Sequence, residues 1–210
     1  MTERIYLLSQ VLTSNIEVVD CIPRDDGHYS IYTKSTIFHP QGGGQPSDIG
    51  WLNEIEVVHV TEKDGDIAHL TTKPVGLGNV LAHVDGERRQ LYSRLHSAGH
   101  LIGHVVELMM WRPIKAHHWP GEGRIVFKPE ANAQSVSVEY VQTICESYIT
   151  QDLSCKITQR GNGVREVSFG NFTPYLCGGT HVTSLGELGN INVQKVKIKK
   201  GNLIVHYDVI

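Results

Sequence analysis

The feature that most constrains this fold is a change of hydrophobic period near residue 86. From there apolar residues recur every three and four positions until Trp111-Arg112-Pro113, which predicts one long helix from about Glu87 to Trp111. The preceding 85 residues show no helical period. They contain short β-branched segments separated by turns such as Asp25-Asp26-Gly27, a pattern typical of a small barrel or sandwich.

The residues after the long helix mix a second helix with further strands. Residues 138–151 share an apolar face, and Ser135 or Ser137 can cap their start. Strands are expected at 124–128, 154–158, 164–168, 191–199 and 203–209. The sequence therefore predicts an α+β protein in two domains: a β domain over residues 1–85, then an α+β domain over residues 86–210 with helices packed on a largely antiparallel sheet.

Charge is distributed unevenly between these two regions. Residues 1–85 carry 5 Lys and Arg against 12 Asp and Glu, whereas residues 86–210 carry 14 against 10. A basic second region suits a polyanionic partner, although uneven surface charge explains the difference equally well. No apolar run is long enough to span a membrane, the N-terminus lacks a signal peptide, and the four cysteines are scattered. We therefore expect a cytoplasmic protein without membrane contact, whose oligomeric state the sequence leaves open.

Two histidines lie four residues apart inside the predicted long helix. Four residues turn a helix by about 400°, so His96 and His100 share one face and can converge on a metal ion. His104 extends the series, but it is rotated by about 80° from His96 and is a weaker third ligand. Zinc proteases with this spacing carry Glu after the first histidine, whereas this chain has Ser97, which disfavours that class.

A second group of possible ligands lies in the segment Cys177-Gly-Gly-Thr-His181. The cysteine offers a thiolate and the histidine an imidazole, and the glycines allow the backbone to aim both at one point. A buried cysteine and a surface histidine around an ordinary turn are the alternative. Together with the helical pair, the set of three nitrogen donors and one sulfur donor favours zinc, and we predict one zinc ion on His96, His100, Cys177 and His181.

A third motif, FHPQGGGQPSDIG, spans residues 38–50. Three consecutive glycines indicate a close approach of the backbone to a ligand or another part of the chain, although a surface turn explains them equally well. The motif lacks the Lys-Ser/Thr ending of a nucleotide-binding P-loop, so phosphate binding of that kind is not expected.

These three motifs, in this order and at these separations, resemble the alanyl-tRNA editing family, which comprises the editing region of alanyl-tRNA synthetase and its AlaX-type relatives. The resemblance covers nearly the whole chain, and it implies an N-terminal β-barrel that carries the glycine motif and a C-terminal α+β domain that carries both zinc motifs. It also implies a trans-editing hydrolase that cleaves the ester of seryl- or glycyl-tRNA for alanine.

The resemblance also implies roles for individual residues. Gln45 matches a glutamine that lines the editing pocket, and we assign the substrate pocket to five residues: Gln45, Gly43, Gly44, Thr180 and His118. No catalytic residue is assigned. At Gly99 the family commonly has threonine, which leaves the preference between serine and glycine open.

Three alternating lysines on the predicted strand 191–199, Lys195, Lys197 and Lys199, can contact RNA phosphates. A solvated edge strand guarded by lysine is an equally good explanation. Two rival functions also stay open: a zinc-stabilised RNA-binding or partner-binding module without hydrolytic activity, and a zinc hydrolase of small esters or amides.

Overall fold

The computed structural model describes residues 1–161 and 164–210. Its contacts divide the chain into two units. The first comprises residues 1–42 and 46–90, and the second comprises residues 43–45 and 91–210. The middle of the glycine motif therefore belongs to the second unit, although it lies early in the sequence. The domain boundary expected after residue 85 stays a prediction.

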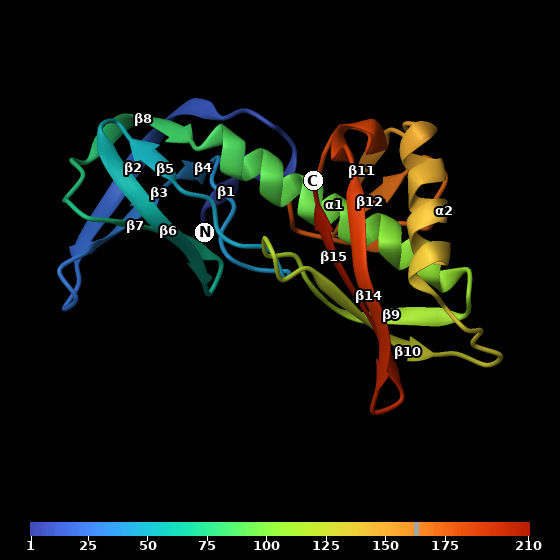
Figure 1. Cartoon of the computed structure of the whole chain (residues 1–210). Helices are drawn as coiled ribbons and strands as arrows, with labels where there is room; N and C mark the ends of the chain where they lie inside the picture. The colour runs from blue at the N-terminus through green and yellow to red at the C-terminus, as the bar shows by residue number, and fades with distance from the viewer. Residues whose placement is uncertain (162–163) are drawn as a thin grey trace. The chain divides into compact units, whose positions relative to one another are not determined.

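Six strands of the first unit close into an antiparallel barrel in the order β2-β3-β7-β6-β5-β8; Figure 1 labels these strands. They are β2 (Thr13–Pro23), β3 (Tyr29–Thr33), β5 (Gly50–Leu52), β6 (Ile55–Lys63), β7 (Asp66–Thr71) and β8 (Gly78–Val84). Buried and exposed residues alternate along β8, as expected for strands with one face in a core. Asp64 and Gly65 both have positive φ, which matches the tight turn that joins β6 to β7.

The start and the middle of this unit hold shorter elements. β1 (Glu3–Arg4) pairs in parallel with β4 (Ser35–Thr36), and a 3-10 turn, η1, spans Ile5–Leu7. A buried ion pair joins Arg89 to Asp48, and the Arg89 guanidinium also donates to the Ile37 carbonyl at 2.7 Å. Because Asp48 accepts the His39 amide at 2.6 Å, this network fixes both ends of the glycine motif within the first unit.

The long helix α1 covers Gly86–Glu107, and the second helix α2 covers Val138–Thr150. The expected extension of α1 to Trp111 is wrong. Met110 has φ 61°, a left-handed conformation that ends the helix, and Trp111 begins strand β9. At α2, the Ser137 hydroxyl accepts the Tyr140 amide at 3.1 Å, so Ser137 is the N-cap.

The second unit contains two antiparallel sheets. One has the order β14-β15-β10-β9 and the other the order β11-β12-β13. The strands are β9 (Trp111–His117), β10 (Arg124–Pro129), β11 (Cys155–Gln159), β12 (Arg165–Phe169), β13 (Tyr175–Leu176), β14 (Ile191–Lys199) and β15 (Asn202–Val209). A second 3-10 turn, η2, spans Leu185–Leu188. Figure 1 shows β14 and β15 as one long hairpin.

One core fills this unit. Leu95, Ile102 and Val105 of α1 are fully buried in the same cluster as Phe127 of β10 and Val205 of β15. The apolar stripe that predicts α1 therefore faces the four-stranded sheet, and the expected α+β class is confirmed. Among the described residues, no helix is both long enough and apolar enough to cross a membrane.

Candidate metal centre

The helix α1 presents His96 and His100 on one face, one turn apart. Their ring centroids are 5.2 Å apart, and both side chains are buried. Leu95, Ala98 and Leu101 take up the core-facing positions between and beside them. The spacing of four residues therefore places the two imidazoles as the sequence predicts.

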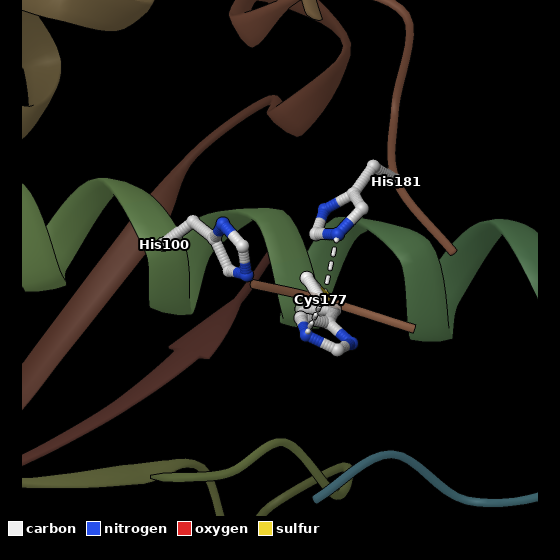
Figure 2. Close-up of side chains that lie close together, drawn as sticks. His100, Cys177 and His181 are labelled. Carbon is white, nitrogen blue, oxygen red and sulfur yellow. Dashed lines mark hydrogen bonds between the residues drawn. The ribbon is translucent and has the colours of Figure 1, made fainter. Parts of the chain in front are cut away.

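The segment after β13 brings the other two predicted ligands to the same place. Cys177 Sγ lies 3.3 Å from His96 Nε2 and 3.2 Å from His181 Nε2. One ligand atom from each of His96, His100, Cys177 and His181 lies within 4.8 Å of the other three. Figure 2 shows His100, Cys177 and His181 directed toward one another beside the helix.

This group is suited to a metal ion. Zn–N bonds of 2.0–2.1 Å and a Zn–S bond of 2.3 Å put tetrahedral nitrogen and sulfur ligands about 3.5 Å apart, close to the observed separations. Three nitrogens and one sulfur form a donor set that zinc prefers. The four residues could therefore hold a metal ion.

Gln45 supports His96 from behind. Its side-chain oxygen accepts a hydrogen bond from His96 Nδ1 at 2.7 Å and another from the Thr180 amide at 3.0 Å. Its side-chain nitrogen donates to Thr180 Oγ1 at 2.8 Å, as does the Ser93 hydroxyl at 2.8 Å. Because His96 Nδ1 carries the proton, Nε2 presents a lone pair to the other ligands.

Ser97 gives His181 the same kind of support. The Ser97 hydroxyl is hydrogen-bonded to His181 Nδ1 at 3.1 Å, and its oxygen accepts the Val182 amide at 3.1 Å. His181 Nε2 therefore also faces the cluster. The serine that replaces the protease glutamate has a positioning role in this chain.

Burial controls the protonation of the cluster. It lowers the pKa of His100 well below its usual range, with further contributions from His118, His104 and Arg165. The neutral imidazole that results is the form that binds a metal. Burial also raises the pKa of the Cys177 thiol, so a nearby cation is needed to hold its thiolate.

His118 forms a wall of the site. Its ring stacks on His96 with centroids 4.3 Å apart, and its Nδ1 lies 2.5 Å from the Tyr207 hydroxyl. That hydroxyl donates its proton to the Leu95 carbonyl at 3.0 Å, so it accepts from His118 Nδ1. His118 Nε2 therefore carries the lone pair, and burial, followed by the His117 charge, lowers the His118 pKa to about 3.

Three glycines allow this close packing. A Cβ on Gly99 would overlap the His118 ring, and one on Gly179 would overlap the His96 ring. A Cβ on Gly44 would lie 2.7 Å from the Ala116 carbonyl oxygen. Gly43 and Gly178 have open space around them, although Gly43 has φ 57°. The close approach inferred for the glycine motif therefore occurs at Gly44.

Comparisons with known proteins show which families this chain is similar to. Residues 164–204 match the family described as the threonyl and alanyl tRNA synthetase second additional domain. The alanyl-tRNA editing protein AlaX-M of Methanosarcina acetivorans is 29% identical over 100% of both chains. The alanyl-tRNA editing protein Aarsd1 of Mus musculus is 31% identical over 84% of this chain and 48% of its own length. This chain is a homologue of the alanyl-tRNA editing proteins.

The alanine–tRNA ligase of Haloquadratum walsbyi is 27% identical over 91% of this chain and 24% of the ligase. The chain thus spans about half the length of Aarsd1 and about a quarter of the ligase, but all of AlaX-M.

Some residues near the ligand group in this homologue could not be identified from the sequence motifs. Ser93 and Tyr207 contribute hydrogen bonds that only the tertiary structure reveals. His104, the weaker candidate ligand, lies outside the cluster: its ring stacks on Tyr175 at 4.4 Å, and its Nδ1 lies 3.5 Å from Glu107. The rotation of about 80° from His96 accounts for this placement.

Proposed function

We propose that this chain hydrolyses the ester bond between tRNA for alanine and a wrongly attached serine or glycine, with one zinc ion held by His96, His100, Cys177 and His181. The observation that carries the proposal is the convergence of those four side chains beside the buried His118 ring, in a homologue of the editing proteins. We place this activity in the cytoplasm, where charged tRNA is found.

The chain's own groups define how a substrate would be held. His118 offers a lone pair at Nε2, which can accept a hydrogen bond from a hydroxyl or ammonium group of the aminoacyl moiety. We assign Gly43, Gly44 and Thr180 to the same pocket, together with Gln45, whose side chain already bonds His96 and Thr180. Alanine has no side-chain hydroxyl to pair with these polar groups, so they would stay without a partner when alanine is bound. The correctly charged product would therefore be spared.

A bound zinc ion supplies Lewis-acid polarisation of a carbonyl or of water. Among the described residues, no carboxylate belongs to the ligand group, so a carboxylate general base is not assigned. The neutral imidazole of His118 and the Thr180 hydroxyl are the polar groups next to the cluster that can orient water.

One observation favours a second candidate function. Four protein ligands normally close a structural zinc site, whereas a catalytic zinc keeps one position open. A zinc-stabilised RNA-binding module without hydrolysis would also place four ligands together. A zinc hydrolase of small esters is the third possibility, and it would cleave substrates that lack the tRNA.

The deciding experiment measures ester loss from seryl-, glycyl- and alanyl-tRNA for alanine, and from the free amino-acid esters. We expect loss from seryl- or glycyl-tRNA with alanyl-tRNA spared. Binding without turnover would support the module, and cleavage of the free esters at the same rate would support the small-ester hydrolase.

The role of zinc is tested by His100→Ala, with His104→Ala as the matched control from the same helix. We expect His100→Ala to lose both bound zinc and deacylation, and His104→Ala to retain the zinc. Full deacylation by metal-free protein would refute the zinc role.

A further inference from the structure

The four-stranded sheet collects basic residues on the face opposite its core. The antiparallel register aligns one residue from each strand in a first row: Lys195, His206, Arg124 and His117. Two residues further along lies a second row: Lys197, Ile204, Val126 and Lys115. Beyond it, Lys128 pairs with Arg112. We call the six cations among these residues the basic face: Arg112, Lys115, Arg124, Lys128, Lys195 and Lys197.

The residues between these rows point to the core. Ile125 and Phe127 of β10 and Leu203 and Val205 of β15 are buried in the hydrophobic cluster. Successive side chains of a strand alternate between the two faces, so the rows of the basic face point away from the core. Four of its six cations are exposed, and Arg124 and Lys197 are partly exposed.

The basic face has little compensating charge. Among the described residues, Arg124 alone of the six has an ion pair, with Glu122 at 3.8 Å, and the same glutamate lies 3.3 Å from His117 at the end of the first row. Like charges that face each other across strands are destabilising. After burial, Lys197, Arg124 and Lys195 lower the pKa of His206, in the middle of the first row. An arrangement that costs folding stability in this way is suited to an anionic partner.

Protection of a sheet edge does not account for this pattern. The sheet order makes β14 and β9 the edge strands. Lysines on β14 are expected on an edge that avoids pairing with other chains. Arg124 and Lys128, however, lie on the interior strand β10, where there is no edge to protect.

We propose that the basic face binds the phosphates of the tRNA acceptor stem. Strands about 4.8 Å apart and rows about 7 Å apart give a patch of roughly 14 by 14 Å. Such an open charged face suits the backbone of an RNA duplex, which proteins recognise through phosphates and shape. This inference rests on the proposed function, because the chemistry alone specifies only a polyanion.

The basic face meets the metal centre at strand β9. The first row ends at His117, and the next residue, His118, stacks on His96. Likewise His206 lies in the first row, while the neighbouring Tyr207 bonds His118. The basic face and the ligand group therefore approach each other at neighbouring residues of β9 and β15, whose side chains point to opposite faces of the sheet.

The test compares two double variants of the full chain with equal net charge. Lys115→Glu with Lys197→Glu alters the basic face, and Lys73→Glu with Lys156→Glu changes exposed lysines elsewhere. Binding of uncharged tRNA for alanine is measured between 50 and 200 mM salt. We expect at least tenfold weaker binding for the face variant, and a slope of log K against log salt reduced by about 2, since each phosphate contact contributes about 0.9. The control should bind within twofold of the wild type.

Face and control variants with equal affinity would overturn the proposal. A face variant that no longer binds vesicles of anionic lipid but still binds tRNA would also overturn it, because the partner would then be a membrane. Deacylation separates this result from the proposed function. If the wild type hydrolyses no aminoacyl-tRNA but the face variant still loses tRNA binding, the basic face stands and editing fails. If seryl-tRNA is hydrolysed with the same KM by face and control variants, editing stands and the basic face fails.

Discussion

Replacement of Gln45 by leucine distinguishes two possible roles of this buried glutamine, support of the metal ligand His96 and contact with the substrate. The change keeps an extended side chain but removes the acceptor for His96 Nδ1 and for the Thr180 amide. Loss of a supporting bond behind a metal ligand typically costs a factor of about 10 to 100 in affinity, or about 1.4 to 2.8 kcal/mol. Two buried donors left without partners add about 1–3 kcal/mol each to the cost in folding stability.

The measurements are zinc affinity, by competition with a chromophoric chelator, and thermal unfolding of the zinc-free and zinc-loaded protein. Gln142→Leu is the matched control. The Gln142 side-chain amide also makes hydrogen bonds to the backbone: it donates to the Ile191 carbonyl at 2.8 Å and accepts the Val193 amide at 2.9 Å. Gln142 lies outside the ligand group. We expect both variants to lose stability, and only Gln45→Leu to lose zinc affinity.

Wild-type zinc affinity in a folded Gln45→Leu protein would refute this reasoning. If that variant instead raised KM for seryl-tRNA without a change in zinc affinity, the glutamine would be a substrate contact, as the sequence motif implies. Gln45→Glu sharpens the distinction, because the carboxylate retains an acceptor for His96 and should keep the metal.

Two further perturbations follow from burial and close packing. Gly99→Ala should destabilise the protein by about 1–3 kcal/mol in thermal unfolding, because the new methyl group overlaps the His118 ring and lies 2.8 Å from the Tyr207 hydroxyl. His118→Ala in the same chain should remove the part of that cost that comes from the ring, and a stabilised single variant would contradict this. His69 is fully buried between Thr36 and the Ile31 carbonyl, and burial lowers its pKa to about 4. As the pH falls, the unfolded chain binds this proton near pH 6.5, whereas the folded chain binds it only near pH 4. The folded state therefore loses about 3 kcal/mol of stability between pH 6.5 and pH 4, and the full stability is present above pH 6.5. His69→Gln should flatten that part of the stability profile, and an unchanged profile would contradict the assignment.

Patterns with a local cause were predictable from the sequence. The α+β class, the helix α2 and the common face of His96 and His100 depend on periodicity, which local sequence determines. The end of α1 was not predictable, because Met109 continues the apolar period although the helix ends at Glu107 and Met110 is left-handed. Apolar spacing carries no information about a single left-handed residue.

Supporting contacts required the tertiary structure. Gln45 is separated from Thr180 by 135 residues, and His118 from Tyr207 by 89. No spacing rule connects such pairs, because the folding of intervening elements decides which side chains meet. The ligand motifs identify chemistry, whereas the hydrogen bonds that select a tautomer depend on the packing of the whole second unit.

The glycines near the cluster show how closely ligand geometry and packing are linked. Gly44, Gly99 and Gly179 come from three separate segments, and each removes a Cβ that would collide with a ring or a carbonyl at the same place. His96 and His118 can stack only because two of these positions lack side chains. A side chain at either position would displace an imidazole and, with it, the nitrogen aimed at the other ligands. The site therefore depends on the absence of side chains as much as on the four donors, because those absences keep each donor in its place.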